Sequence, residues 1–86
     1  MPNFNIEAAQ IFLTDKLSWN IYAPIENSKL VITAKWLVDN YSESLDLTND
    51  SDTAPLINNL QKYGDIENID IFISKLDELS KMIAPD

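Results

Sequence analysis

The chain has no cysteine, no histidine and no arginine. Without cysteine there is no thiol nucleophile and no thiolate metal site. Without histidine there is no imidazole base and no histidine metal ligand, and without arginine the bidentate phosphate clamp is missing. Carboxylates, lysines, serines and tyrosines remain, and no catalytic motif joins them. We therefore expect a protein that is not an enzyme and that holds no cofactor or metal ion.

The lack of cysteine also bears on location. A small secreted domain usually needs disulfides to reinforce its core, and the N-terminal stretch lacks the basic leader and long apolar run of a signal peptide. No window approaches the roughly 18 apolar residues that a membrane-spanning helix needs. These absences predict a cytoplasmic protein.

Glycine occurs once and proline four times among the 86 residues. One glycine excludes a glycine-rich loop that cradles phosphate. So few flexible or broken positions favour long helices over a turn-rich β fold. Hydrophobic residues make up 45% of the chain, which suffices for a globular core. The length allows a single domain, residues 1–86.

The first expected helix covers residues 6–17. Asn5 can cap it. Four apolar residues spaced three or four apart form one stripe along it: Ile6, Ala9, Leu13 and Leu17. Residues 18–24 are rich in strand formers and end at Pro24, which cannot continue a helix. We expect an extended connector or a short strand there.

The second expected helix covers residues 29–44, with Asn27 and Ser28 as candidate caps. Its apolar stripe consists of Leu30, Ala34, Leu37, Tyr41 and Leu45. Every second residue from 30 to 38 is also apolar, as in a strand. A hairpin that pairs residues 19–23 with residues 30–37 is therefore the alternative.

Residues 46–52 are expected to form a polar loop. Thr53 can cap a third helix that has Pro55 in its first turn and ends before Gly64, where a left-handed residue is favourable. The last helix, residues 68–83, ends before Pro85. Its stripe consists of Ile69, Phe72, Ile73, Leu76, Leu79 and Ile83. These elements predict an all-α fold, a small four-helix bundle, with an α+β fold carrying a short hairpin at about residues 19–37 as the alternative.

The charge is unevenly divided along the chain. Residues 1–38 hold three acidic residues and three lysines and are neutral. Residues 39–86 hold eleven acidic residues and three lysines, so the entire net charge of −8 lies there. No base occurs between Lys35 and Lys62. Such a field repels the anionic surfaces of nucleic acids and membranes and attracts a basic protein surface.

The stretch DNYSESLDLTNDSD, residues 39–52, holds five carboxylates: Asp39, Glu43, Asp46, Asp50 and Asp52. It does not fit an EF-hand calcium loop. Counted from Asp46, the sixth residue is Ser51 where glycine is needed, and the twelfth is Ile57 where glutamate is needed. Asp50-Ser51 matches two residues of the acyl carrier signature Asp-Ser-Leu, but Asp52 stands in place of the leucine. An acyl-carrier-like protein is therefore only a third alternative for the function.

We expect a small acidic protein that binds a basic surface of a partner protein, such as the nucleic-acid site of an enzyme. Inhibitors, immunity proteins and anti-defence proteins that mimic nucleic acid act in this way. The five carboxylates would take the places of phosphates. Trp36 would be the apolar anchor beside Asp39, because a large aromatic residue near charged ones is typical of a binding hot spot. The other interpretation of Trp36 is core packing against Trp19 or the connector.

Other interpretations of the whole chain remain open. Acidic residues also keep proteins soluble, so the stretch can be only a solvated face. The chain can instead be a structural or adaptor subunit that binds through an apolar aromatic surface. A bundle this small can also complete its core by forming a homodimer.

Overall fold

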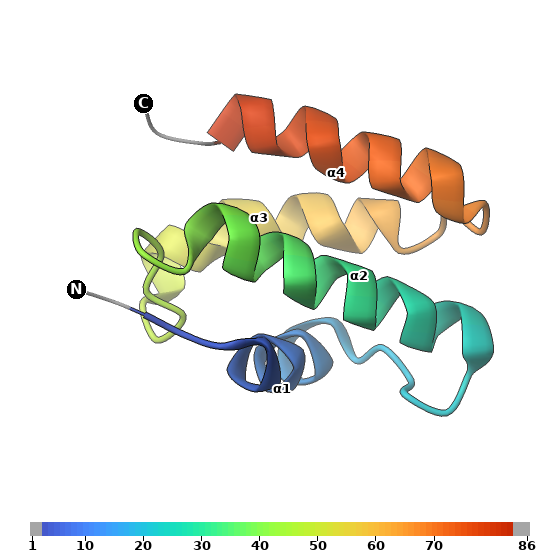
Figure 1. The fold of residues 1–86 in the computed structure, drawn as a ribbon, viewed down its shortest axis with the longest axis horizontal. Helices are drawn as coiled ribbons and strands as arrows, with labels where there is room; N and C mark the ends of the chain where they lie inside the picture. Colours follow the sequence, from blue (N-terminus) through green and yellow to red (C-terminus); the bar gives the residue numbers. More distant parts are fainter. Residues whose placement is uncertain (1–2, 84–86) are drawn as a thin grey trace.

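A computed structural model describes residues 3–83, which form four helices: α1 Ile6–Leu17, α2 Pro24–Tyr41, α3 Asp50–Tyr63 and α4 Ile69–Ile83 (Figure 1). None of the described residues forms a strand. The prediction of a small all-α bundle is confirmed, and the alternative with a hairpin is wrong. No helix within residues 3–83 has both the length and the apolar composition needed to cross a membrane.

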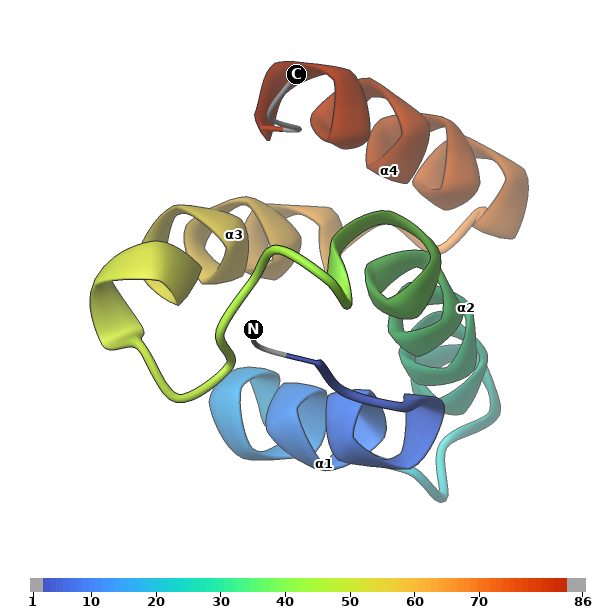
Figure 2. The same ribbon diagram turned by 60° about the vertical axis from the view of Figure 1, so that its left-hand side comes forward.

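Within the described part of the chain, each helix packs against two others. The α2 helix contacts α1 and α4, and α3 contacts the same two helices, so the packing closes in the order α1, α2, α4, α3 (Figure 2). The apolar faces of all four helices meet in one core. Its buried hydrophobic members are Ala9, Phe12, Leu13, Trp19, Leu30, Ala34, Leu37, Tyr41, Leu56, Leu60, Phe72, Leu76 and Leu79.

Asparagine opens three of the four helices. The side-chain oxygen of Asn5 accepts a hydrogen bond from the Ala8 N–H at 2.8 Å, which confirms the predicted cap of α1. Asn49 caps α3 in the same way, and the oxygen of Asn68 accepts from the Ile71 N–H in the first turn of α4. Each cap satisfies an N–H that has no partner inside the helix.

The α2 helix begins at Pro24, and the predicted start at residue 29 is wrong. Proline fits the first position of a helix because its missing N–H is not needed there and its φ angle is already helical. The Asn27 N–H bonds to the Ala23 carbonyl at 2.8 Å, which closes the first turn. Asn27 and Ser28 therefore lie inside the helix and do not cap it. Residues 18–20 are irregular, residues 21–23 form a turn, and none of them forms a strand.

The α3 helix begins at Asp50, and the predicted cap at Thr53 is wrong. The cap is Asn49, which lies inside the loop that was expected at residues 46–52. Thr53 is buried instead, and its hydroxyl donates to the Asn49 carbonyl at 3.2 Å. Pro55 then lies inside the helix, beyond its first turn. Because proline has no N–H, the carbonyl of Ser51, four residues earlier, receives no helical hydrogen bond. Pro55 and Ser51 are both exposed, so water can reach that carbonyl.

Among residues 3–83, the left-handed backbone conformation occurs at Ser18 and not at Gly64. Ser18 has φ 57° and ends α1, with its N–H bonded to the Thr14 carbonyl at 3.0 Å. Gly64 has an ordinary right-handed backbone, so the prediction for it is wrong. Glycine leaves room there, because a Cβ would lie 3.2 Å from both the indole nitrogen of Trp19 and the Gln61 carbonyl oxygen, which is closer than an ordinary contact.

Two residues of the predicted stripes are exposed to solvent. Ile6 and Ile73 are exposed, since α4 turns only the side that carries Phe72 and Leu76 toward its neighbours. Leu45 was expected on the second helix but lies beyond its end, half-buried in the following segment. The side chain of Ile83 and all of Pro85 lie outside the described residues.

Trp19 and Lys29 connect the first half of the chain with the second. The ring of Trp19 meets the ring of Phe72 edge to face, with the centroids 6.1 Å apart. Lys29 is only 3% exposed, and its ammonium group donates a hydrogen bond to the carbonyl of Gly64. The same ammonium lies 6.0 Å from the centroid of the Phe72 ring. These contacts hold the start of α2 against α4 and the end of α3.

Candidate functional site

The five carboxylates of residues 39–52 lie at one end of the bundle, and we call them the acidic surface: Asp39, Glu43, Asp46, Asp50 and Asp52. They come from the last turn of α2, the segment after it and the first turn of α3, where the chain reverses its direction (Figure 1). All are exposed except Asp46, which is partly buried. The predicted binding carboxylates are therefore neighbours along one reversal of the chain.

Two of the five carboxylates have a lysine partner. The Nζ atom of Lys35 lies 3.3 Å from Oδ2 of Asp39, and Nζ of Lys16 in α1 lies 3.7 Å from Oδ1 of Asp50. Ion pairs this exposed to solvent contribute little energy. Among the described residues, no ion pair reaches the other three carboxylates. Most of the negative charge of the acidic surface is thus uncompensated.

Asp46 is held in place by Thr48. Its Oδ1 accepts hydrogen bonds from the Thr48 hydroxyl at 2.6 Å and from the Thr48 N–H at 2.9 Å. The hydroxyl bond first, and the backbone bond second, lower the pKa of Asp46 below its ordinary value because they stabilise the ionised form. Asp46 is therefore a fixed negative charge whose second oxygen takes no part in this turn.

Two carboxylates of the acidic surface, Asp50 and Asp52, belong to the start of α3, whereas Glu43 is exposed in the turn after α2. The side-chain oxygen of Asn49 accepts from the N–H groups of Ser51 and Asp52, at 3.0 and 3.3 Å. Asp50 and Asp52 lie in the first turn, where negative charge is favourable because the helix dipole is positive at that end. Both residues thus stabilise α3 locally, whatever else they contact. Ser51, the serine of the acyl-carrier alternative, is exposed beside them.

Trp36 lies on the flank of α2, between the core and the solvent. Helical spacing predicted that it would share this flank with Ile32, Asp39, Asn40 and Glu43. The first three and Trp36 line one groove of about 210 Å³ between α2 and α4, together with Lys35, Ile73, Leu76 and Asp77. The prediction for Glu43 is wrong, because α2 ends at Tyr41 and Glu43 does not line this groove. The ring of Trp36 meets the ring of Tyr41 edge to face, with the centroids 5.2 Å apart, and does not pack on the ring of Trp19. Trp36 is thus partly in the core and partly open to a partner.

The polar atoms of this aromatic pair are turned inward. The indole nitrogen of Trp36 and the hydroxyl of Tyr41 are buried, and neither has a hydrogen-bond partner among the described residues. Burial raises the pKa of Tyr41, because the charged form would be desolvated. Only the carbon face of Trp36 can therefore meet a partner across the groove.

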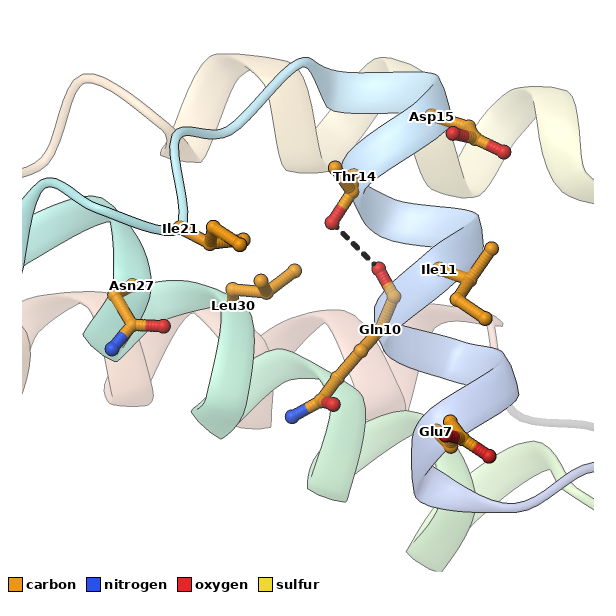
Figure 3. A pocket seen from close by; sticks show the side chains of 8 residues that line it. All are labelled: Glu7, Gln10, Ile11, Thr14, Asp15, Ile21, Asn27 and Leu30. Atoms are coloured by element: carbon orange, nitrogen blue, oxygen red, sulfur yellow. Dashed lines mark hydrogen bonds between the residues drawn. The ribbon is translucent and has the colours of Figure 1, made fainter.

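The sequence did not predict a second depression, which we call the α1 groove. It has a volume of about 470 Å³ and lies between α1, the turn before α2, and α2 itself (Figure 3). Its lining consists of Glu7, Gln10, Ile11, Thr14, Asp15, Ile21, Asn27 and Leu30. One signal was present in the sequence: residues 7, 11 and 15 are four apart, off the core stripe, and read acidic, apolar, acidic.

The chain matches no family model, no curated protein and no solved structure. Among residues 3–83, no group of three or more carboxylates is close enough to hold a metal ion. The function therefore has to be argued from the surfaces of this molecule itself.

Proposed function

We propose that this protein binds a basic surface of another protein and blocks it, using the acidic surface as the contact. The observation that supports this function is the uncompensated charge at the reversal between α2 and α3. Five carboxylates gather there, only two of them have a lysine partner, and those two pairs are exposed and weak. Such a concentration of charge attracts a cationic surface and speeds the encounter with it.

The carboxylates are displayed on a fixed frame. Thr48 holds Asp46, and the Asn49 cap holds the first turn of α3, so little freedom is lost when a partner binds. A nucleic-acid enzyme offers a suitable target, because its binding site carries lysine and arginine side chains spaced to meet phosphates. The acidic surface would occupy that site, and the bulk of the bundle would exclude the nucleic acid.

Trp36 would add an apolar contact beside the charges. The groove that it lines also contains Ile73 and two carboxylates, Asp39 and Asp77. An aliphatic side chain of the partner can enter between these groups while its basic neighbours meet the carboxylates. Aromatic residues in such settings carry a large share of binding energy.

The test compares two variants with the same net charge. The first neutralises the acidic surface with D39N, E43Q, D46N, D50N and D52N. The second neutralises five carboxylates elsewhere with E26Q, D65N, E67Q, D70N and E78Q. Four of these are exposed, and Glu26 is partly buried, as Asp46 is. Glu78 is paired with Lys75. Each variant carries five fewer negative charges than the parent chain.

Partners are first captured from a lysate of the organism that encodes the chain, at low and at high salt, and identified by mass. The affinity of the purified partner is then measured for all three proteins. We expect the first variant to bind at least about tenfold more weakly and to lose most of its salt dependence. Equal weakening by both variants would show that only net charge matters and would end the proposal.

A structural or adaptor subunit is the second candidate, and the groove beside Trp36 is the observation that favours it. In that case the captured partner stays bound at high salt, and W36A abolishes binding while the neutralised variants keep it. The acyl-carrier alternative has its own readout. An intact-mass measurement of protein purified from its native cells would show a covalent addition at Ser51.

A further inference from the structure

The α1 groove combines an apolar floor with exposed apolar walls. Leu30 is 4% exposed and forms the floor, whereas Ile11 of α1 is 59% exposed and Ile21 of the preceding turn is 44% exposed. Figure 3 shows Ile21 and Leu30 reaching toward α1 from the opposite side. Leaving two isoleucine side chains this open to water is unfavourable unless another surface covers them.

Apolar exposure is concentrated in this part of the molecule. Six of the nine large hydrophobic side chains that are exposed in residues 3–83 lie between residues 6 and 31: Ile6, Ile11, Ile21, Tyr22, Ile25 and Val31. Residues 1–38, which contain this segment, contribute nothing to the net charge. The acidic surface and the α1 groove are therefore built from different residues with different chemistry.

The wall that carries Ile21 is held in place before any partner arrives. The Asn20 N–H donates to a carboxylate oxygen of Glu26 at 2.6 Å, and the Tyr22 N–H donates to the side-chain oxygen of Asn20 at 2.8 Å. These bonds hold the turn on both sides of Ile21. The floor residue Leu30 lies on α2, so the groove does not need to be assembled on binding.

The rim of the groove is acidic. Glu7 and Asp15 lie one helical turn before and after Ile11 and share one side of α1 with it (Figure 3). Neither carboxylate takes part in an ion pair within residues 3–83, and no lysine lines the groove. Lys16, the nearest base in sequence, is turned toward Asp50.

We propose that the α1 groove is a second binding site, which takes a basic amphipathic helix of a partner protein. Glu7 and Asp15 are eight residues apart, which is roughly 12 Å along the helix axis at 1.5 Å per residue. A partner helix with two basic residues about seven positions apart and an apolar residue between them matches this spacing. Its apolar side chain covers Ile11, Ile21 and Leu30, and its cations meet the two carboxylates.

Other occupants fit the groove less well. A second copy of this chain would bring a net charge of −8 to an acidic rim, so repulsion opposes it. An extended peptide would need a strand edge to pair with, and none of the described residues forms a strand. The site does not depend on the function proposed for the acidic surface, because the two share no residue.

The probe is a fluorescein-labelled helical peptide with leucines on one face and two lysines seven residues apart beside them. Two control peptides carry serine in place of the leucines or glutamine in place of the two lysines. Binding to the full chain is followed by fluorescence anisotropy. Amide chemical shifts of the labelled protein show where the peptide lies.

The protein variants are chosen at exposed positions, so that they fold. I11Q and the pair E7Q with D15N alter the α1 groove. I71Q and the pair D65N with D70N make the same chemical changes at exposed positions outside it. We expect each groove variant to weaken peptide binding at least about fivefold, and each control variant to change it less than about twofold.

The proposal also requires that both control peptides bind more weakly than the probe peptide. The residues whose amide chemical shifts change on binding must lie around the α1 groove. Absence of binding at millimolar peptide, or equal effects of I11Q and I71Q, would overturn it. A concentration-dependent dimer that I11Q abolishes would also overturn it, in favour of a second copy. The variant in which all five carboxylates of the acidic surface are neutralised should still bind the peptide. Binding by that variant would show that this site is independent of the function proposed above.

Discussion

The two halves of this chain share one core but present different surfaces. Residues 1–38 are neutral and carry most of the exposed apolar side chains, whereas residues 39–86 carry the entire net charge of −8. Both halves contribute leucines and aromatic residues to the interior. Core packing therefore does not account for the difference, because it constrains only the buried positions. The contrast is a property of the surface residues of the two halves.

The most damaging change should be the loss of Phe72, which joins the halves. Phe72 is fully buried and meets Trp19 and Lys29 of the first half. We expect F72A to lower the free energy of unfolding by about 3–5 kcal/mol, measured by urea denaturation, since it removes a large ring from a packed core. Its neighbour Ile71 is exposed, so I71A should cost no more than about 0.5 kcal/mol. Similar losses for both would contradict a core shared by the halves.

A smaller loss is expected when the polar link between the halves is cut. K29M keeps most of the side-chain volume but removes the ammonium group that donates to the Gly64 carbonyl. We expect the free energy of unfolding to fall by about 1–2 kcal/mol, because the carbonyl of the half-buried Gly64 loses a charged donor. K62M is the matched control, since Lys62 is exposed and the change in net charge is the same. The link is unimportant if the two variants have equal stability.

The cap of α3 allows the acidic half to be tested by itself. N49A removes the oxygen that accepts from the Ser51 and Asp52 N–H groups. We expect a loss of about 1 kcal/mol and a lower melting temperature by circular dichroism. N58A, at an exposed position in the middle of the same helix, should not destabilise the protein. A melting temperature unchanged by N49A would mean that the first turn of α3 does not depend on its cap.

The smallest expected effect concerns Asp46. Hydrogen bonds from Thr48 lower its pKa below the ordinary value of 3.8. The stability that the ionised carboxylate contributes is therefore present above that ordinary value and is lost as the pH falls through the lowered pKa. T48A removes the hydroxyl bond, so the pKa of Asp46 should rise in a carboxyl-carbon NMR titration. S51A removes a hydroxyl that is not bonded to Asp46 and should leave the pKa of Asp46 unchanged. If T48A also leaves this pKa unchanged, the Thr48 hydroxyl is not what lowers it.

Much of the fold could be predicted because its causes are local. The α1 helix follows from the Asn5 cap and the spacing of Ala9 and Leu13, and its bounds agree with the prediction. The start of α2 was missed because Pro24 can end one helix or begin another, and the chain near it is equally compatible with a strand. Only packing against α1 and α4 decides between these states.

The candidate site could be predicted only in part, for a similar reason. The acidic surface lies on consecutive residues, so its carboxylates are visible in the sequence. The α1 groove joins residues 7–15 with Ile21 and Leu30, and such a juxtaposition depends on how α1 packs against α2. The partnership of Lys16 with Asp50 also spans two helices and has no sequence signal.

The sequence by itself determined which side-chain types are absent, how the charge is divided and where apolar residues recur at helical spacing. These features depend on composition and on neighbours within about four residues. The tertiary structure alone decided the role of Gly64, which makes room for Trp19, and the exposure of Ile11 and Ile73. It also decided that Asp50 of the acidic surface pairs with Lys16 of α1. Contacts between distant segments select these features, and no local pattern encodes them.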